Sequence, residues 1–222
     1  MQSDISQKCV EALAAIAKSS APALITSGDR IEIGGTKVRL QARTEEEGKV
    51  DNPSGFLIGL AVDVFVNDVF QPVTFGVVGT GRDRDDAIQT GAREWAMYVG
   101  EALLNALGVK IGDEPQKIGK FLVYKGLVGI REASGTHAAP LSKEQRRQLL
   151  ESFGPLIHLM EQSPGELHSI SLTIMVHDGT ADGECRVDGK TAPELLKAIQ
   201  SIAWNQNGSN YIFKQFFVLR RS

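Results

Sequence analysis

Alternating apolar residues on both sides of Asn67-Asp68 constrain the fold of this chain more than any other feature of its sequence. From Phe56 to Val66 every second residue is large and apolar, which is typical of a strand with one buried face. The alternation continues after Asn67-Asp68, so we expect a two-residue turn there and an antiparallel hairpin over 56–77. On the apolar face the predicted pairs are Val66 with Val69, Val62 with Val73, Leu60 with Phe75 and Ile58 with Val77.

The other face of this hairpin carries small residues and a proline. The same register sets Gly59 opposite Gly76 and Pro72 opposite Asp63. Because proline has no N–H to donate to a neighbouring strand, the strand that contains it is expected at the outer edge of its sheet. A slip of one residue would expose the whole apolar face, so the pattern favours a single register.

Helical and strand periodicities predict further elements along the rest of the chain. Helices are predicted over 5–17, 83–107, 142–152 and 155–160, with a last one from a capping box at Thr191 to Glu194 to near Trp204. Gly108 is expected to close the helix over 83–107 in a left-handed conformation. Strands are predicted over 31–33, 38–40, 121–130 with a bend at Lys125-Gly126, 169–176, 185–187 and 211–219. The charged stretch 44–55 is predicted to be a loop, and 178–183 a turn.

Hairpins followed by helices indicate an α+β fold, with antiparallel sheets that carry helices packed on one face. The stretch 133–140 reads as a connector, which predicts an N-terminal α+β half over 1–132 and a C-terminal α+β half over 141–222. Both halves can be written as helix, hairpin, helix and strand, and they can still pack as one compact unit.

Composition excludes several classes of protein. With 42% hydrophobic and 23% charged residues among 222, the chain has a globular rather than a disordered or fibrous composition. A net charge of −3 without a strongly basic half argues against a nucleic-acid partner. The apolar stretch 56–66 is too short to cross a membrane, so no membrane partner is expected. The start of the chain does not resemble a secretory signal and two cysteines suit a reducing compartment, so we expect a cytoplasmic location.

Gly79-Thr80-Gly81 between a predicted strand and a predicted helix suggests a phosphate-binding turn, since glycines let a ligand approach the free amides of a helix start. Arg84 stands where a dinucleotide-binding motif has its third glycine, however. Asp83, Asp85 and Asp86 would also repel an anion while they complement the helix dipole. A turn followed by a helix cap is therefore the favoured interpretation.

Asp178 to Gly189 partly matches a calcium-binding loop, with acids at the first and fifth positions and glycine at the sixth. Thr180 and Gly189 occupy the third and twelfth positions, so the glutamate that would complete the coordination is missing. A hairpin turn explains the same residues better.

Histidines and cysteines give no catalytic or metal-binding set. His168 and His177 are an odd number of residues apart on one predicted strand, which puts them on opposite faces. His137 lies in the connector near Ser134, but no Gly-x-Ser-x-Gly motif surrounds that serine. We therefore assign no catalytic, cofactor-binding or metal-binding residue and expect no cofactor. The remaining candidates read as surface or core side chains: His158, Cys9 and Cys185.

Several segments resemble an uncharacterised bacterial domain family of unknown function, over about 55–222. The first segment runs from Val62-Asp63-Val64 through Gly79-Thr80-Gly81 to the helix that opens with Asp86-Ala87-Ile88 and contains Trp95. The later ones are Glu184 to Gly189, the helix that ends near Trp204, and Tyr211 to Phe217. These motifs are turns, caps and core aromatics. The resemblance implies a bacterial origin and an α+β fold and carries no catalytic residue.

The sequence favours a non-enzymatic protein that acts by binding another protein, such as a toxin antagonist of the immunity type or an accessory of a secreted effector. This hypothesis depends on two predicted sheet faces of small or hydroxyl residues, which permit close approach: Gly59, Ala61, Thr74 and Gly76 on one, and Ser169, Ser171 and Thr173 on the other. The alternative is an enzyme or small-molecule binder with its site near the 79–86 loop, where it would meet His137 or Asp178. A self-associating module that forms a homodimer is a third interpretation.

Overall fold

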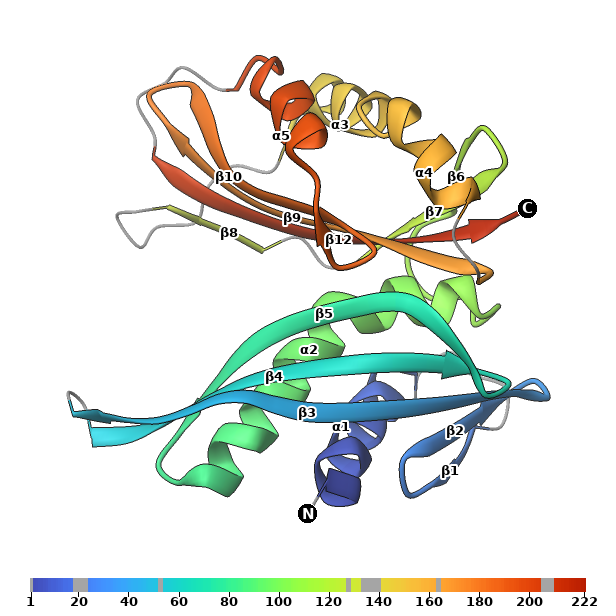
Figure 1. Ribbon diagram of the computed structural model, residues 1–222, viewed down its shortest axis with the longest axis vertical. Helices are drawn as coiled ribbons and strands as arrows, with labels where there is room; N and C mark the ends of the chain where they lie inside the picture. Colours follow the sequence, from blue (N-terminus) through green and yellow to red (C-terminus); the bar gives the residue numbers. More distant parts are fainter. Residues whose placement is uncertain are drawn as a thin grey trace.

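The computed structural model describes residues 2–17, 24–51, 54–126, 129–132, 141–162, 165–204 and 210–222. Figure 1 shows two antiparallel sheets stacked one above the other, with helices packed against them. The predicted α+β class is therefore confirmed. The two sheets are separate, and no strand in the described ranges belongs to both.

The first sheet has the strand order β1-β2-β3-β4-β5, so each strand pairs with its neighbour in the chain. Its strands are β1 (Leu24–Ser27), β2 (Arg30–Ile33), β3 (Thr36–Asp51), β4 (Ser54–Val66) and β5 (Val69–Gly81). Helices α1 (Gln2–Ala17) and α2 (Arg84–Ala106) cover one face. The alternate residues of β4, from Ile58 to Val64, are buried in the core beneath these helices, as the alternation predicts.

The second sheet has the order β11-β10-β9-β12-β7-β6, and β8 pairs with the start of β12. Its strands are β6 (Gln116–Ile118), β7 (Phe121–Lys125), β8 (Gly129–Glu132), β9 (Leu167–His177), β10 (Thr180–Val187), β11 (Lys190–Thr191) and β12 (Tyr211–Arg221). One face packs under the short helices α3 (Lys143–Glu151), η1 (Gly154–Leu156), α4 (Ile157–Glu161) and α5 (Pro193–Gln200).

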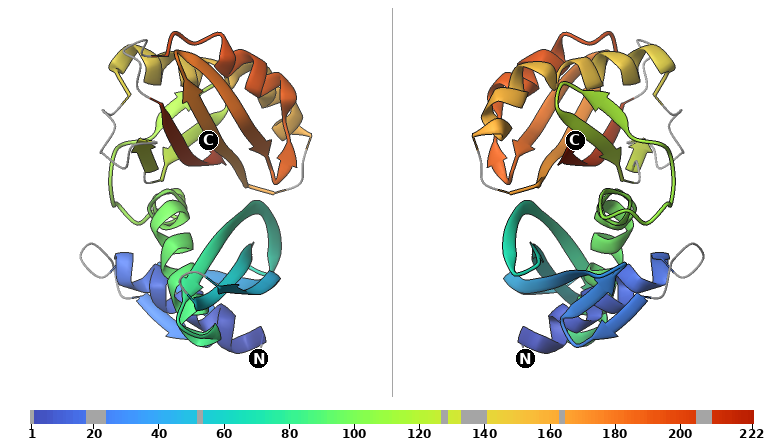
Figure 2. Two further views of the ribbon diagram at one scale, coloured as in Figure 1. Left: turned by 90° about the vertical axis from the view of Figure 1, so that its left-hand side faces the viewer. Right: turned by 90° about the vertical axis from the view of Figure 1, so that its right-hand side faces the viewer.

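Helix α2 packs against both sheets (Figures 1 and 2). On the second sheet, Phe216 and Val218 of β12 belong to the same apolar core as the buried face of α2. Near the end of the helix, Arg220 donates a hydrogen bond to the carbonyl oxygen of Ala106 at 2.8 Å. One long helix thus fixes the position of the second sheet relative to the first.

Two of the three predicted helix ends are confirmed, the cap before α2 and the glycine after it. Asp83 caps α2 by accepting a hydrogen bond from the amide of Asp86, and Gly108 follows the helix with φ of 93°. Ser142 caps α3. The capping box predicted at Thr191 to Glu194 is wrong, because Thr191 pairs with Arg186 in β11 and Ala192 takes the cap position without a side-chain hydrogen bond.

The central hairpin has the predicted turn and only part of the predicted register. Asn67 and Asp68 have φ of 50° and 64°, and Val66 pairs with Val69. Beyond a bulge opposite Asp63 the register shifts by two residues, so that Leu60 pairs with Val77, Ile58 with Gly79 and Ala61 with Gly76. The pairings predicted beyond the bulge are therefore wrong, but a shift of two leaves every side chain on its predicted face. β5 is the edge strand, as Pro72 predicts.

The loop predicted over 44–55 is wrong, because β3 continues to Asp51 and β4 begins at Ser54. Charge and glycine suggested a loop, but pairing between the two strands continues through Gly48 and Leu57 after a bulge between Thr44 and Glu47. Two further differences concern strands: β1 lies where no strand is predicted, and β10 begins at Thr180, inside the turn predicted over 178–183.

The predicted connector 133–140 lies outside the described residues, and the division into two halves there stays a prediction. The strands β6, β7 and β8 precede this stretch and belong to the second sheet. β7 ends at Lys125 and β8 begins at Gly129, so the strand predicted over 121–130 is interrupted where Lys125-Gly126 indicated a bend.

Candidate binding cleft between the sheets

A cavity of about 440 Å³ lies between the outer face of the first sheet and the second sheet. Strands β4 and β5 form one wall, strands β9, β10 and β12 form the other, and α2 contributes two side chains. We call this cavity the cleft. Its walls come from segments that are about 100 residues apart in the chain, so it exists only because α2 and the contacts between β5 and β9 hold the two sheets together.

The wall from the first sheet combines small residues with the larger side chains of Leu60, Phe75 and Val77. Gly59 and Ala61 of β4 and Thr74 and Gly76 of β5 all line the cleft. Val78 follows on the same face and is 51% exposed, which is unusual for a large apolar side chain in a sheet. The backbone of both strands is therefore close to the surface of the cleft.

The wall from the second sheet is polar and charged. Ser171 and Thr173 of β9, Glu184 and Arg186 of β10 and Lys214 of β12 line the cleft. They share one face of the sheet, because their neighbours along each strand, such as Leu172 and Cys185, are buried under the short helices on the other face.

Helix α2 contributes Glu94 and Tyr98 to the cleft, one helical turn apart. The Tyr98 ring contacts Phe75 of β5 with centroids 5.9 Å apart, and Phe75 contacts Phe216 of β12 at 4.9 Å. This aromatic cluster closes one part of the cleft with apolar surface. Glu94 is half-buried beside it.

Most charged groups around the cleft are already paired. Glu184 and Arg186 lie 2.9 Å apart, and Arg43 bonds both Asp63 and Glu45 on the first sheet. Within the described ranges, neither Glu94 nor Lys214 has a hydrogen bond or an ion pair from its side chain. These two residues are therefore the charges that the cleft offers to a ligand.

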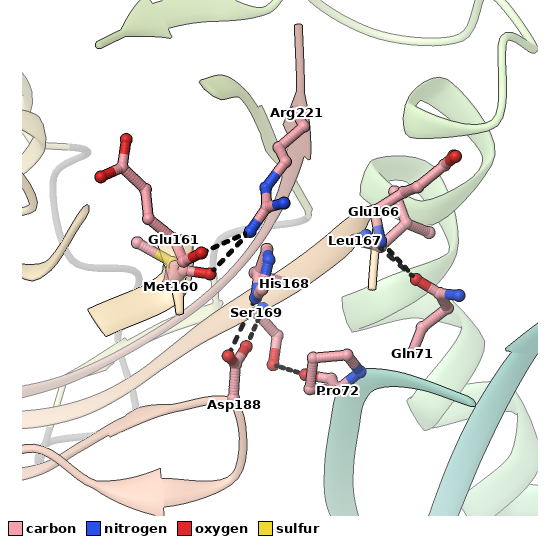
Figure 3. A network of polar contacts seen from close by, with 10 residues as sticks. All are labelled: Gln71, Pro72, Met160, Glu161, Glu166, Leu167, His168, Ser169, Asp188 and Arg221. Atoms are coloured by element: carbon pink, nitrogen blue, oxygen red, sulfur yellow. Dashed lines mark hydrogen bonds and ion pairs between the residues drawn. The ribbon is translucent and has the colours of Figure 1, made fainter. Parts of the chain in front are cut away.

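A network of hydrogen bonds closes the cleft where the two sheets meet (Figure 3). The buried side chain of Gln71 accepts hydrogen bonds from the amides of Glu166 and Leu167, each at 3.0 Å. Ser169 donates its hydroxyl hydrogen to the carbonyl oxygen of Pro72 at 2.8 Å. The bulge in β5 places both Gln71 and Pro72 against β9.

Asp188 supports this network from the turn after β10. One carboxylate oxygen accepts a hydrogen bond from the amide of Ser169 at 2.9 Å, and the other lies 2.9 Å from Nδ1 of His168. His168 is fully buried and its ring packs edge-on against Phe121. Its Nε2 has no hydrogen-bond partner within the described residues. We interpret this histidine as a structural residue of the joint between the sheets.

The glycines of Gly79-Thr80-Gly81 serve packing in this structure. Both belong to β5, and a Cβ added at Gly79 would lie 2.1 Å from the carbonyl oxygen of Ala87, while one at Gly81 would lie 2.4 Å from the amide of Ala87. The strand therefore passes in contact with the backbone of α2. Asp83 caps the helix, and two hydrogen bonds from Arg82, first its amide and then its guanidinium, lower the pKa of the Asp86 carboxyl.

The other candidates from the sequence that the structure describes do not line the cleft. Asp178 and Gly179 form the turn between β9 and β10, with φ of 47° and 77°, and the residues that follow are strand rather than a coordination loop. His137 lies outside the described residues, and neither Asp178 nor any residue of 79–86 lines the cleft. His168 is buried and His177 is exposed. The described ranges contain no group of three or more His, Cys, Asp or Glu residues that could hold a metal ion.

Both cysteines are buried in apolar surroundings. Burial raises the pKa of Cys9 to about 12 and that of Cys185 to about 12, with a smaller contribution from Glu184 in the second case. The thiolate is the reactive form of cysteine, so neither side chain suits a nucleophilic role at neutral pH.

Six of the seven small and hydroxyl residues that the sequence singles out line the cleft, and Ser169 is the exception because its hydroxyl is used in the joint. Sequence reasoning missed the charged residues. Alternation with buried neighbours could have placed Glu184, Arg186 and Lys214 on the same face as Ser171. No signal in the sequence distinguishes Glu94 from the other charged residues of α2.

The fold defines an α+β protein of two antiparallel sheets with a cleft between them. The chain belongs to the family of unknown function DUF6348, which matches residues 26–221. This confirms the resemblance to an uncharacterised family. No curated protein and no solved structure matches the chain. None of the described helices combines the length and the apolar character that crossing a membrane requires.

Proposed function

We propose that the protein acts by binding another protein, and that the cleft receives a segment of that partner. The observation that carries the proposal is the convergence of two sheet faces on one cavity, where Gly59, Ala61 and Gly76 of the first sheet face Ser171 and Thr173 of the second. The glycine and alanine positions of the first wall allow a polypeptide to approach the backbone there. The exposed hydroxyl groups offer hydrogen bonds to a polypeptide.

The chemistry of the lining residues favours binding over catalysis. The described residues of the cleft include no histidine and no cysteine, and Glu184, the carboxylate opposite Thr173 in the strand pairing, is already engaged by Arg186. Glu184 and Arg186 neutralise one another at 2.9 Å. A toxin antagonist of the immunity type and an effector accessory protein are two classes that act by such binding. These roles, like the cytoplasmic location and the bacterial origin, remain predictions from the sequence.

A second groove, of about 600 Å³, runs between α1 and α2 and is lined by residues such as Ala12, Ile16 and Met97. We favour the cleft as the binding site because its walls present backbone, hydroxyl groups and unpaired charge together. The groove offers mainly the apolar sides of two adjacent helices.

The test is co-expression of the protein with the products of adjacent genes, followed by purification and mass spectrometry of any stable complex. A blocking variant, Gly76→Trp, places a large side chain in the cleft, because a Cβ at Gly76 meets only the carbonyl oxygen of Leu60 at 3.9 Å. Gly48→Trp is the matched control, since a Cβ at Gly48 meets nothing within 4 Å and Gly48 lies outside the cleft.

We expect one adjacent gene product to co-purify with the wild type and with Gly48→Trp, and to be lost from Gly76→Trp. Thermal unfolding of both variants shows whether each retains the fold. Failure of every adjacent product to co-purify contradicts a role as antagonist or accessory protein. A complex that forms equally well with folded Gly76→Trp contradicts the cleft as the binding site.

A further inference from the structure

The open edge of β5 faces the cleft. β5 is the outermost strand of the first sheet and pairs only with β4 among the described strands. Alternate backbone N–H and C=O groups of an edge strand point away from the sheet and are free to pair with another strand. The edge strand of this sheet is thus the one that borders the cleft.

The lining residues show that the cleft borders β5 along its length as well as the outer face of the first sheet. Five consecutive residues of β5, Thr74 to Val78, line the cleft. On β9 and β10 only alternate residues do so, namely Ser171 and Thr173, and Glu184 and Arg186. The interior strand β4 also contributes consecutive residues, Gly59 to Ala61, so the assignment of β5 as an edge depends on the strand order, and the run Thr74 to Val78 shows how much of that edge strand borders the cleft.

The bulge in β5 makes this edge accessible. Before the bulge, Gln71 and Pro72 bond directly to β9 and close that end. After the bulge, from Thr74 onward, no backbone hydrogen bond links β5 to the second sheet within the described residues. The strand and the second sheet diverge there, and the cleft occupies the space between them.

We infer that a partner segment binds in extended form along Thr74–Val78 and adds a sixth strand to the first sheet. This inference rests on the proposed function and specifies its mode. Strand addition derives affinity from backbone hydrogen bonds and specificity from alternate side chains of the bound segment. Gly76, in the middle of this stretch, leaves room for the added strand.

Helix α2 sets the side chains that the segment must carry. The helix runs antiparallel to β5, because Gly81 contacts Ala87, Gly79 contacts Gly91 and Phe75 contacts Tyr98. Glu94 and Tyr98 are one turn apart, about 6 Å along the axis, which matches the spacing of about 6.6 Å between alternate residues of a strand. The segment is therefore a polypeptide with a lysine or arginine for Glu94 and, two positions away, an apolar side chain for the rings of Phe75 and Tyr98.

The experiment selects peptides of about twelve residues from a random library displayed on phage, with the full-length protein immobilised. We expect the selected peptides to share a basic residue two positions from an apolar one. Titration of a selected peptide should show binding about tenfold weaker to Glu94→Gln, since a charge-assisted contact is lost. Glu101→Gln, a neutralised acid on α2 outside the cleft, is the matched control and should bind like the wild type.

Backbone pairing has its own readout. Amide hydrogen exchange should slow within 74–78 when the peptide binds. Of two peptides N-methylated at odd or at even positions, the one whose methyl groups replace the amides that pair with β5 should lose binding, and the other should keep it. Binding that Gly76→Trp blocks, but without protection of 74–78 or sensitivity to N-methylation, overturns strand addition and leaves the proposed function intact.

Two further outcomes also overturn the inference. If the library yields no binding peptide, the inference of strand addition is contradicted. The co-expression experiment tests the proposed function independently of this result. If the amides of 74–78 become protected from exchange without peptide, as the protein concentration is raised and a dimer forms, the edge pairs with a second copy of the chain instead.

Discussion

The side-chain oxygen of Gln71 accepts the backbone amide hydrogen of Leu167 at 3.0 Å, although the two residues are 96 positions apart in the chain. The same oxygen accepts the amide of Glu166, also at 3.0 Å. A glutamine on the edge strand of one sheet thus satisfies two amides at the start of β9 in the other. This contact fixes the closed end of the cleft.

Replacement of Gln71 by methionine should therefore destabilise the protein and loosen the joint between the sheets. Two amides would lose their acceptor, one of them buried, so we expect a loss of about 2–4 kcal/mol in the free energy of unfolding. Urea denaturation measures this loss. Gln41→Met, at an exposed position of β3, is the control and should change the free energy of unfolding by less than about 0.5 kcal/mol. Equal stability of the two variants would contradict the role of Gln71.

Asp188 should matter for the same joint because it holds both the amide of Ser169 and the ring of His168. Asp188→Ala leaves two buried donors without a partner, so we expect a loss of about 2–4 kcal/mol in unfolding free energy. Asp182→Ala removes an exposed acid from β10 and is the matched control. Chemical denaturation distinguishes the two, and a loss at Asp188 no larger than at Asp182 would show that the network adds little.

The contact between β5 and α2 gives a prediction within a single strand. A Cβ at Gly79 would lie 2.7 Å from the amide nitrogen of Gly91, whereas one at Gly76 would be in ordinary contact at 3.9 Å. Gly79→Ala forces backbone apart, and we expect it to cost about 3 kcal/mol or more in unfolding free energy. Gly76→Ala should be neutral within about 0.5 kcal/mol. A thermal unfolding midpoint for Gly79→Ala as high as that of Gly76→Ala would contradict this packing.

Much of this architecture follows from local rules that the sequence displays. The period of two in β4 predicts which face is buried, and it stays correct in β5 because the register shift is two residues rather than one. The shift itself depends on contacts such as that between Pro72 and Ser169, which are 97 positions apart. No local pattern contains that information. The loop prediction for 44–55 is wrong for a related reason, because pairing between β3 and β4 determines the structure there despite the charged composition.

The cleft shows the same division between local and distant information. Its small and hydroxyl residues could be assigned to sheet faces from alternation alone. That the two faces meet depends on the contacts of α2 with β12 and of β5 with β9, which no periodicity reveals. Glu94 is distinguished only by its place in the assembled fold, where it faces the edge of β5 without a partner among the described residues.

The buried thiols predict how the stability of the protein depends on alkaline pH. Burial raises the pKa of Cys9 from 9.0 to about 12, so the folded protein keeps a thiol proton that the unfolded chain loses above pH 9. The unfolded state then binds fewer protons, and the free energy of unfolding falls as pH rises from about 9 toward 12, by up to about 1.4 kcal/mol per pH unit and thiol.

Cys9→Ala should reduce that slope while the remaining contribution of Cys185 persists, because burial raises the pKa of that thiol as well. Urea denaturation between about pH 8 and pH 10 measures the free energy of unfolding of the two proteins. The slope of this free energy against pH does not change if the smaller side chain lowers stability equally at every pH. The same burial predicts that a thiol reagent labels neither cysteine in the native protein at pH 8 and labels both in urea. Identical slopes for the two proteins, or rapid labelling of the native protein, would show that Cys9 is accessible to water.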